Sequence, residues 1–303
     1  MPELPEVEVI RIFLEDKFLG LKIKKIKILS PKSFIGNPEL VEGQKIVKFT
    51  RIGKQLSIHL SNGLILLVHL KMTGQLLFKS PLSKVLRSSE GRDLEGLKMF
   101  GHPTKNTLKN LPNKSTRLIF TFSDKSKLFF NDQRKFGWIK LLSKTELTES
   151  QKDLGLDIFN PLFTPKYIYS QFQKSSRAVK LVLLDQHYFA GIGNIYANDV
   201  LFLAKIHPQI PAQHISRSQA LKLHRSLLSI MHQSILVGGS TARDQKYLRP
   251  DGTKGQNQFS FRVYQREKEP CLICQTPIKK LQLGGRGTFY CPRCQPAVVG
   301  QSL

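Results

Sequence analysis

Four cysteines near the end of the chain put the strongest constraint on its fold. They form two Cys-x2-Cys pairs, Cys271 with Cys274 and Cys291 with Cys294, and 16 residues separate the pairs. This spacing is typical of two knuckles on a β-hairpin that hold one zinc ion with four thiolates. A redox or iron centre is the alternative, but no fifth ligand or open position is indicated. We therefore expect one structural zinc ion that holds the shape of this module and does no chemistry.

The N-terminal half reads mostly as strands. Hydrophobic residues alternate with polar ones, the period of half-buried strands, in two triplets: Leu56, Ile58 and Leu60, then Leu118, Phe120 and Phe122. Further β-rich runs cover 45–50 and 64–70, so we expect a β-sandwich or flattened barrel. Residues 6–19 have a helical pattern that would anchor the N-terminus against the sheet. Residues 80–115, rich in Gly, Pro, Ser, Lys and Asn, are interpreted as a partly disordered surface insertion.

From about residue 165 the period becomes helical. Ser216 followed three residues later by Gln219 forms a capping box that starts a long helix, which ends at Gly238-Gly239. A second helix is predicted over 195–203, and the turn-rich segment 251–258 is predicted to be a mobile loop. One face of the long helix is marked by Ala220, Leu223, Leu227, Ile230, Met231 and Ser234.

The charge balance indicates a polyanionic partner. Lys and Arg total 47 against 22 Asp and Glu, which gives a formal net charge of +25. Such a charge favours nucleic acid through phosphate neutralisation, although an anionic membrane surface or a generally basic proteome would produce a similar total. The N-terminus lacks the apolar core of a signal peptide, and the longest apolar run, 64–68, is far too short for a membrane helix. We expect a cytosolic protein.

The N-terminus carries a candidate catalytic pair. Once Met1 is removed, Pro2 has a free secondary amine beside the carboxyl group of Glu3. A free α-amino group titrates near ~7.7 to 8.0 and is partly neutral at physiological pH, so it can attack an electrophilic sugar carbon and form an iminium. Glu3 can move protons to the sugar or the leaving group. The alternative is a processed terminus with solvated glutamates.

Taken together, the two ends of the chain resemble the formamidopyrimidine-DNA glycosylase family. Motifs in family order link the Met1–Val7 start to the cysteine module over nearly the whole chain, and only the 80–115 insertion falls outside them. These motifs are Gly53-Lys54, His69–Gly74, Asn131–Gly137, Leu183–Gln186, Gly191–Ala197, Gly238–Thr241 and Thr288–Cys291. The resemblance implies a bifunctional enzyme that removes 8-oxoguanine and formamidopyrimidines from double-stranded DNA and then cleaves the abasic strand by β,δ-elimination.

The resemblance also implies roles for the catalytic residues. Pro2 would attack C1′ and form the Schiff base, and Glu3 would be the acid/base. Lys54 would assist β-elimination, and Arg286, between glycines in the hairpin, would hold the phosphate during δ-elimination. Cations at these places make sense, because they stabilise departing phosphates. Without the resemblance, Lys54 reads as a solvated strand lysine.

DNA contacts follow from the same resemblance. His69, Arg134, Lys180 and Asn194 would touch the backbone around the lesion, while Met72, Arg134 and Phe136 would fill the void left by the flipped base. From the residues alone, Met72 and Phe136 read as core packing. Segment 251–258 resembles a lesion-capping loop.

The chain departs from the family pattern at four places. Arg117 stands in place of a DNA-contacting histidine, Ser175 lies near an often basic position, Asn198-Asp199 replaces Ser-Glu, and glycines are lost within 263–270.

We expect an α+β multidomain monomer in the bacterial cytosol or nucleoid. Its predicted parts are a catalytic β-sandwich (1–143), a helix-two-turn-helix DNA-binding domain with the capping loop (144–261), and a C-terminal zinc-finger β-hairpin (262–303). Two alternatives have different functions. One is an endonuclease VIII-like glycosylase for oxidised pyrimidines, and the other is a non-catalytic protein that binds damaged DNA.

Overall fold

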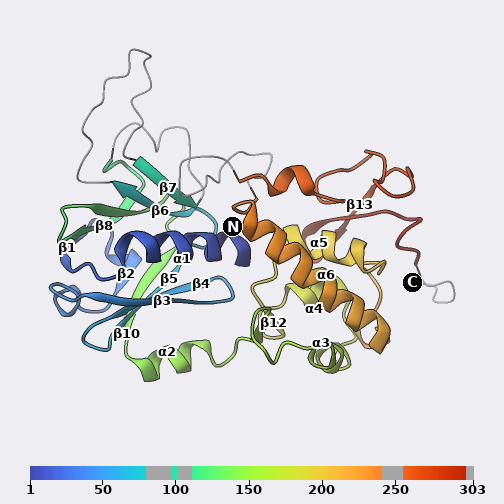
Figure 1. Cartoon of the computed structure of the whole chain (residues 1–303). Coiled ribbons are helices and arrows are strands. Elements are labelled where there is room, and N and C mark those ends of the chain that lie inside the picture. Colours follow the sequence, from blue (N-terminus) through green and yellow to red (C-terminus); the bar gives the residue numbers. More distant parts are fainter. Residues whose placement is uncertain (80–96, 102–110, 241–254, 298–303) are drawn as a thin grey trace, which may run out of the picture. The chain divides into compact units, whose positions relative to one another are not determined.

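A computed structural model describes residues 1–79, 111–240 and 255–297, together with the backbone of 97–101. The chain divides into two compact units, Met1–Lys152 with Val237–Gln256, and Asp153–Leu236 with Asn257–Leu303 (Figure 1). The second unit contains both the helical segment and the cysteine module, and the boundaries that we expected between these two domains stay a prediction. A buried apolar cluster that includes Phe202 of a helix and Phe289 of the hairpin joins the segment and the module.

The strands in the described part of the first unit form two five-stranded sheets. One has the order β1-β8-β9-β6-β7 and the other β2-β10-β5-β4-β3. All neighbours pair antiparallel except β2 with β10. The strands are β1 Ile23–Ile28, β2 Phe34–Ile35, β3 Ile46–Ile52, β4 Gln55–Leu60, β5 Ile65–His69, β6 Gly74–Lys79, β7 Leu97–Gly101, β8 Thr116–Phe122, β9 Lys127–Asp132 and β10 Trp138–Leu142. The expected β-sandwich is thus confirmed.

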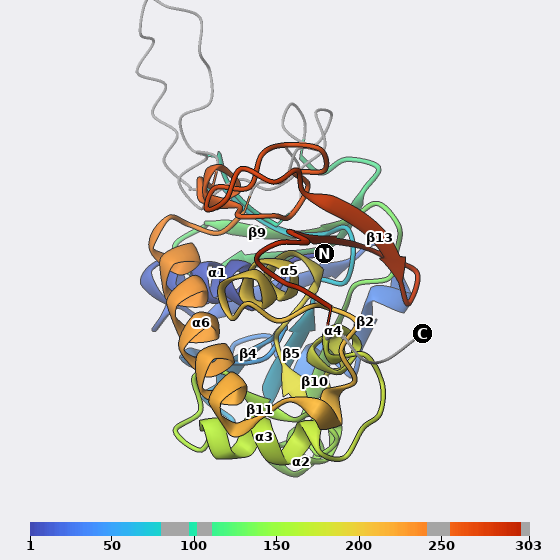
Figure 2. The same cartoon turned by 90° about the vertical axis from the view of Figure 1, so that its right-hand side faces the viewer.

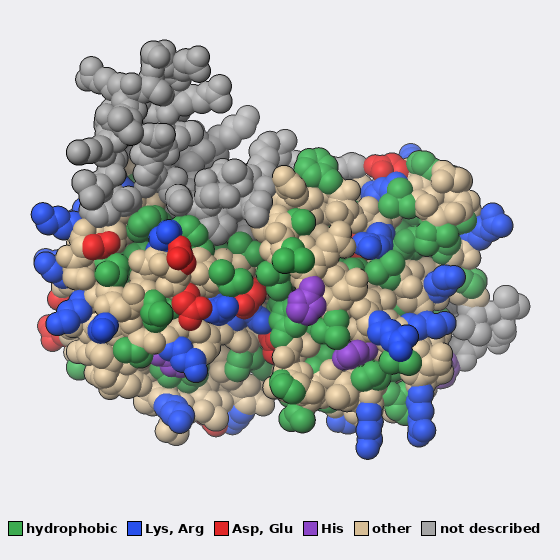
Figure 3. Space-filling model, in the orientation of Figure 1, with side chains coloured by type: hydrophobic (Ala, Val, Ile, Leu, Met, Phe, Trp, Pro, Cys, Tyr) green, Lys and Arg blue, Asp and Glu red, His purple; other side chains and the backbone are tan. Residues whose placement is uncertain are grey.

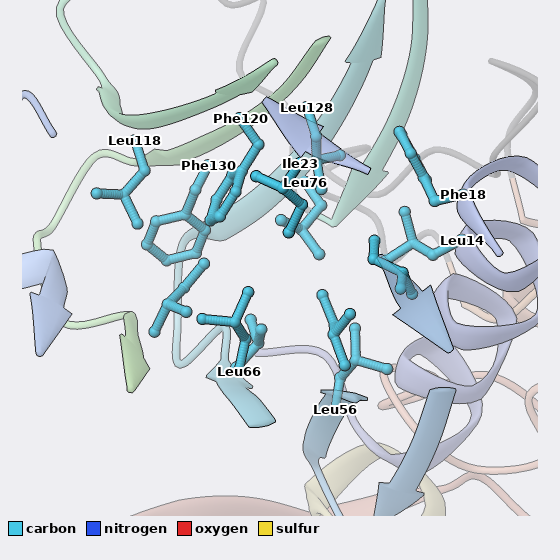
Figure 4. Close-up of a cluster of buried hydrophobic side chains, with 14 of the residues drawn as sticks. Leu14, Phe18, Ile23, Leu56, Leu66, Leu76, Leu118, Phe120, Leu128 and Phe130 are labelled. Atoms are coloured by element: carbon cyan, nitrogen blue, oxygen red, sulfur yellow. The ribbon is translucent and has the colours of Figure 1, made fainter. Parts of the chain in front are cut away.

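One continuous apolar core lies between the two sheets (Figure 4). The alternating residues of β4 and β8 point into it, as the period-two pattern predicts. Helix α1 (Leu4–Phe18) contributes Leu14 and Phe18 to the same core and packs against β3. The predicted N-terminal helix is therefore present, and it ties the start of the chain to the sandwich.

Part of the expected insertion is regular structure. β7 lies inside residues 80–115 and extends the first sheet by pairing with β6. Residues 80–96 and 102–110 of the insertion, and 251–254 of the expected capping loop, lie outside the described residues. Helix α2 (Lys144–Gln151) follows the last strand of the sandwich.

Helices dominate the second unit, where α6 runs beside α3 and α5 (Figure 2). The capping box of α6 is confirmed, because Ser216 and Gln219 exchange backbone-to-side-chain hydrogen bonds of 2.9 and 3.2 Å. All six predicted face residues of α6 are buried. The elements are β11 Leu156–Asp157, α3 Pro165–Phe172, α4 Val179–Leu184, β12 Phe189–Ala190, α5 Asn194–Leu203, α6 Arg217–Leu236, β13 Lys279–Leu283 and β14 Arg286–Tyr290. Short 3-10 turns cover Pro31–Ser33, Pro38–Leu40, Ala212–His214 and Asn257–Ser260.

Candidate active site

Helix α1 starts directly after the candidate catalytic pair. Glu3 is the N-cap residue, and its backbone N–H donates to Glu6 Oε2 at 2.9 Å. The other oxygen of Glu6 accepts the backbone N–H of Ser240 at 2.9 Å. Pro5 fits in the first turn because the missing N–H would have no partner there. Pro2 and Glu3 are both buried, and the hydrogen bond from the Glu3 N–H to Glu6 ties the backbone at Glu3 to the first turn of the helix.

Lys54 lies in the tight turn between β3 and β4. Ile52 pairs with Gln55, which leaves a two-residue loop with Gly53 first at a φ of +57°. Glycine is favoured at the first position of such hairpin loops because it adopts positive φ without strain. The Lys54 side chain is only 8% exposed, so it is not the solvated strand lysine that the residues alone suggest.

An ion pair connects this turn to α1. Arg51 donates through Nε to Glu8 Oε2 at 2.8 Å and through Nη1 to the Gly53 carbonyl at 3.0 Å. Burial raises the pKa of Glu8, but hydrogen bonds and positive charge from Arg11 and Arg51 outweigh it and lower the pKa below its ordinary value. Glu8 therefore stays ionised and holds the Lys54 turn beside the first turns of α1.

His69 lies next to this turn, because β4 and β5 pair Gln55 with His69. Its Nδ1 accepts the backbone N–H of Lys71 at 3.0 Å, which places the proton of the neutral ring on Nε2. Burial lowers the pKa of His69 to about 3, with smaller contributions from the charges of Lys71 and Lys54. His69 is thus a neutral hydrogen-bond donor.

The predicted void-filling residues lie on two loops at the same end of the sandwich. Trp138 of β10 pairs with His69, and Gly74 of β6 pairs with Asp132 of β9, so the intervening loops meet there. Met72 is 46% exposed and Phe136 54% exposed, so the alternative of core packing is wrong. The Arg134 guanidinium lies 5.0 Å from the centroid of the Phe136 ring. Arg117 is at this end too, but its Nε donates to the Asp132 carbonyl at 2.8 Å.

Arg286 is exposed at the tip of the β13–β14 hairpin in the second unit. Gly284 and Gly285 form the two-residue turn with φ of +55° and +72°, a conformation that favours glycine. A Cβ on Gly284 would lie 2.6 Å from Leu181 Cδ2, so the turn packs closely on α4. The predicted projection of Arg286 from a tight turn is therefore present.

Lys180 and Asn194 hold this hairpin. Lys180 is fully buried, and its Nζ donates to the Gly287 carbonyl at 3.0 Å and to Thr288 Oγ1 at 2.7 Å. Asn194, the first residue of α5, donates through Nδ2 to the same carbonyl at 3.2 Å. The buried Lys180 ammonium presents no surface to DNA here. Direct DNA contact by either residue stays a prediction.

The four cysteines fit one zinc ion. Their Sγ atoms all lie within 4.8 Å of one another, and three of the separations are 3.4, 3.5 and 3.8 Å. Tetrahedral zinc with Zn–S bonds of about 2.3 Å separates its sulfurs by roughly 3.8 Å. Backbone N–H groups of Ile273 and Cys294 donate to the sulfurs of Cys271 and Cys291, which favours thiolates.

Sequence reasoning missed several supporting residues of the second unit. Asn198 Oδ1 accepts the Phe289 N–H at 2.8 Å, and the Asp199 carboxylate accepts three consecutive N–H groups of 262–264. In the sequence, both residues stand out only as departures from the family pattern. Gln265 and Lys268 follow in the same stretch and have φ of 59° and 67°. Both residues adopt the left-handed conformation without being glycine, at a cost of roughly 1–2 kcal/mol per residue.

Comparison with known proteins agrees with this arrangement. Three family models match in order: the formamidopyrimidine-DNA glycosylase N-terminal domain at 1–139, the H2TH domain of the same family at 154–246, and the zinc finger found in FPG and IleRS at 268–297. The formamidopyrimidine-DNA glycosylase of Listeria innocua is 36% identical over 97% of this chain and 100% of its own. The chain belongs to the formamidopyrimidine-DNA glycosylase family.

Solved structures of this glycosylase family share the fold. The protein from Thermus thermophilus is 33% identical, covers 97% of this chain and 98% of its own, and has a TM-score of 0.80. The Lactococcus lactis enzyme in complex with Fapy-dG DNA is 30% identical with a TM-score of 0.81 and coverage of 97% and 100%. Among the described residues, no helix is long and apolar enough to cross a membrane.

Proposed function

We propose that this glycosylase excises oxidised purines from double-stranded DNA as a monomer and then cleaves the strand at the abasic site. The observation that carries the proposal is the grouping of site residues at one end of the sandwich whose helix α1 begins directly after Glu3. These residues are Lys54, His69, Met72, Arg134 and Phe136. Relatives have been solved with DNA that holds Fapy-dG, an abasic site or carbocyclic 8-oxo-G. We propose the bacterial cytoplasm as its location, as for its bacterial relatives.

The reaction starts at Pro2, whose amine must be free of Met1. The nitrogen attacks C1′ and loses its proton, and the damaged base leaves with the electrons of the glycosidic bond. Glu3 protonates the sugar oxygen O4′, so the C1′–O4′ bond breaks and the nitrogen lone pair forms the iminium with C1′. The resulting iminium acidifies the C2′ proton. Loss of that proton expels the 3′ phosphate, and Lys54 stabilises the charge that develops.

Arg286 serves the second elimination, in which the 5′ phosphate leaves. Its guanidinium can take two phosphate oxygens at once, and its exposure at the hairpin tip suits this contact. His69 serves a different purpose, because a neutral Nε2–H can donate to a phosphate oxygen without adding charge. We assign DNA contacts to Arg117 and Asn194 as well. The zinc ion is structural, and no reaction step passes through it.

Borohydride trapping tests the proposal directly. Reduction of the iminium links the protein covalently to DNA, so we expect crosslinks to duplexes that carry 8-oxoguanine, Fapy-dG or an abasic site. Thymine glycol should react weakly. The matched control retains an N-terminal tag, which turns the Pro2 nitrogen into an amide and should abolish both base release and crosslinking.

Three outcomes would contradict the proposal. Normal crosslinking by the tagged protein means that another residue is the nucleophile. A preference for thymine glycol points to the endonuclease VIII-like specificity. Tight binding to damaged duplexes without any crosslink indicates a protein that binds damage and does not excise it.

A further inference from the structure

A buried carboxylate lies between the two loops that carry the predicted void-filling residues. Asp132 is the last residue of β9 and is 0% exposed. The first loop, 70–73, joins β5 to β6, and we call it the Met72 turn. The second, 133–137, joins β9 to β10, and we call it the Arg134 loop. Both belong to the first unit, and Asp132 touches both.

The carboxylate of Asp132 accepts hydrogen bonds from each loop. Oδ1 accepts the Thr73 hydroxyl of the Met72 turn and the Arg134 N–H at 3.2 Å. Oδ2 accepts the Gly137 N–H, at the end of the Arg134 loop, at 2.6 Å. The Arg134 N–H also lies 3.0 Å from Thr73 Oγ1, which joins the loops directly. The two oxygens of Asp132 offer enough lone pairs to accept all three donors at once.

The surrounding backbone leaves little room for another arrangement. A Cβ on Gly137 would lie 2.9 Å from Phe130 Cζ and 3.2 Å from Asp132 Oδ2. A Cβ on Gly74 would lie 2.3 Å from the Leu70 carbonyl oxygen. The backbone of Asp132 is held as well, since its N–H donates to Ser115 and its carbonyl accepts Arg117 Nε, each at 2.8 Å. Asp132 is therefore fixed through both its side chain and its backbone.

We infer that Asp132 is a positioning residue that sets the Met72 turn and the Arg134 loop in one fixed relation. The exposed side chains of Met72, Arg134 and Phe136 then enter the duplex as one preformed group, without a separate ordering step for each loop. The inference rests on the proposed function, in which these side chains fill the space left by the flipped base. We expect the positioning role of Asp132 to matter for duplex DNA alone, because a single strand has no opposing base to hold and no base stack to fill.

The Asp132→Asn variant tests this role. The amide keeps the size of the carboxylate but turns one acceptor into a donor, which must then face Thr73, Arg134 or Gly137. Loss of one hydrogen bond to a charged group predicts a roughly ten- to hundredfold loss of preference for a duplex with a tetrahydrofuran abasic analogue over an intact duplex. Borohydride trapping on single-stranded abasic DNA should stay within about twofold of the unaltered protein, because Pro2 and Glu3 are untouched.

Two controls separate positioning from folding. Asp124→Asn alters another turn carboxylate of the same sheet, which accepts the N–H and hydroxyl of Ser126, and should change neither measurement. Thr73→Val removes one donor to Asp132 and should lower the duplex preference in the same direction by a smaller factor. Trp138, the only tryptophan of the chain, directly follows the Arg134 loop. Its fluorescence should change less on duplex binding in Asp132→Asn than in the unaltered protein.

Failure of the positioning role of Asp132 can be distinguished from failure of the proposed function. An unaltered protein that forms no crosslink with abasic DNA overturns the proposed chemistry, while the binding preference still tests Asp132. An Asp132→Asn variant with unchanged duplex preference overturns the positioning role. Equal losses on duplex and single-stranded DNA also overturn it, because they show that Asp132 only supports the fold.

Discussion

The two regions that present the proposed site residues are supported in different ways. In the first unit, the loops around Lys54 and Met72 project from a sandwich whose two sheets enclose one continuous apolar core. In the second unit, the Arg286 hairpin rests on a small cluster around Val263 and Phe289, on four thiols, and on polar groups of Lys180, Asn194, Asn198 and Asp199.

The two regions thus hold their site residues in place by different means, apolar burial in the first unit and metal ligation with buried polar contacts in the second. Apolar burial is spread over many side chains, so one truncation weakens the sandwich but leaves its geometry intact. Metal ligation and buried polar contacts depend on single atoms, so one change can release the whole hairpin. On the face drawn in Figure 3, basic side chains lie over both regions, so on this face positive charge alone marks neither of them.

The largest effect should come from Cys274→Ser, which removes one thiolate. Because zinc binding supplies folding free energy to such modules, the variant should lose zinc and hairpin order together, and DNA affinity with them. The thermal transition of the sandwich should persist. Metal analysis and calorimetry measure these changes, and Cys274→His, which can restore a fourth ligand, is the matched control. Retention of one zinc per chain in the serine variant would contradict the thiolate site.

Leu66→Ala should instead weaken the sandwich and spare the hairpin. Leu66 is 1% exposed in the core between the sheets (Figure 4), so truncation should cost about 2–5 kcal/mol of unfolding free energy. Zinc content should not change. Denaturant unfolding measures the cost, and Leu40→Ala, at a side chain that is 51% exposed, should cost little. Loss of zinc in Leu66→Ala would show that the two supports are not independent.

Arg286→Ala should affect phosphate handling and leave Schiff-base formation intact. We expect damaged-duplex binding to weaken by about 1.5–3 kcal/mol, with a salt dependence reduced by about one phosphate. On abasic DNA at saturating protein, trapping should persist while δ-elimination product falls relative to β-elimination product. Lys279→Ala removes an equal charge at the opposite end of the hairpin and serves as the control. An unchanged salt slope and product ratio would make Arg286 a solvated turn residue.

His69 should produce the smallest effect, as a dependence of stability on pH. Its pKa falls from an ordinary 6.5 to about 3 in the folded protein, mainly through burial. The unfolded chain therefore binds the proton first, and stability is lost as the pH falls below 6.5. By pH 5.5 the loss should be about 1.4 kcal/mol relative to pH 8. Unfolding free energies at both pH values should differ less in His69→Gln, and an equal difference in both proteins would refute a buried neutral ring.

Sequence patterns determined the parts of this protein that depend on local chemistry. The alternation in β4 and β8, the buried face of α6 and its Ser216 cap repeat along neighbouring residues, so periodicity alone finds them. Zinc ligands follow from the Cys-x2-Cys spacing, because two knuckles need that geometry. The order of the motifs along the chain then sufficed to identify the family.

Tertiary structure alone decided which polar side chains support the site. Lys180 bonds to Thr288, 108 residues away, and Thr73 bonds to Asp132, 59 residues away. Neither pairing leaves a periodic signal, because a buried polar group is satisfied by whatever the fold brings near it. For the same reason Lys180, for which the family resemblance implies a DNA contact, lies buried under the Arg286 hairpin, and Arg117 is tied to the backbone of Asp132.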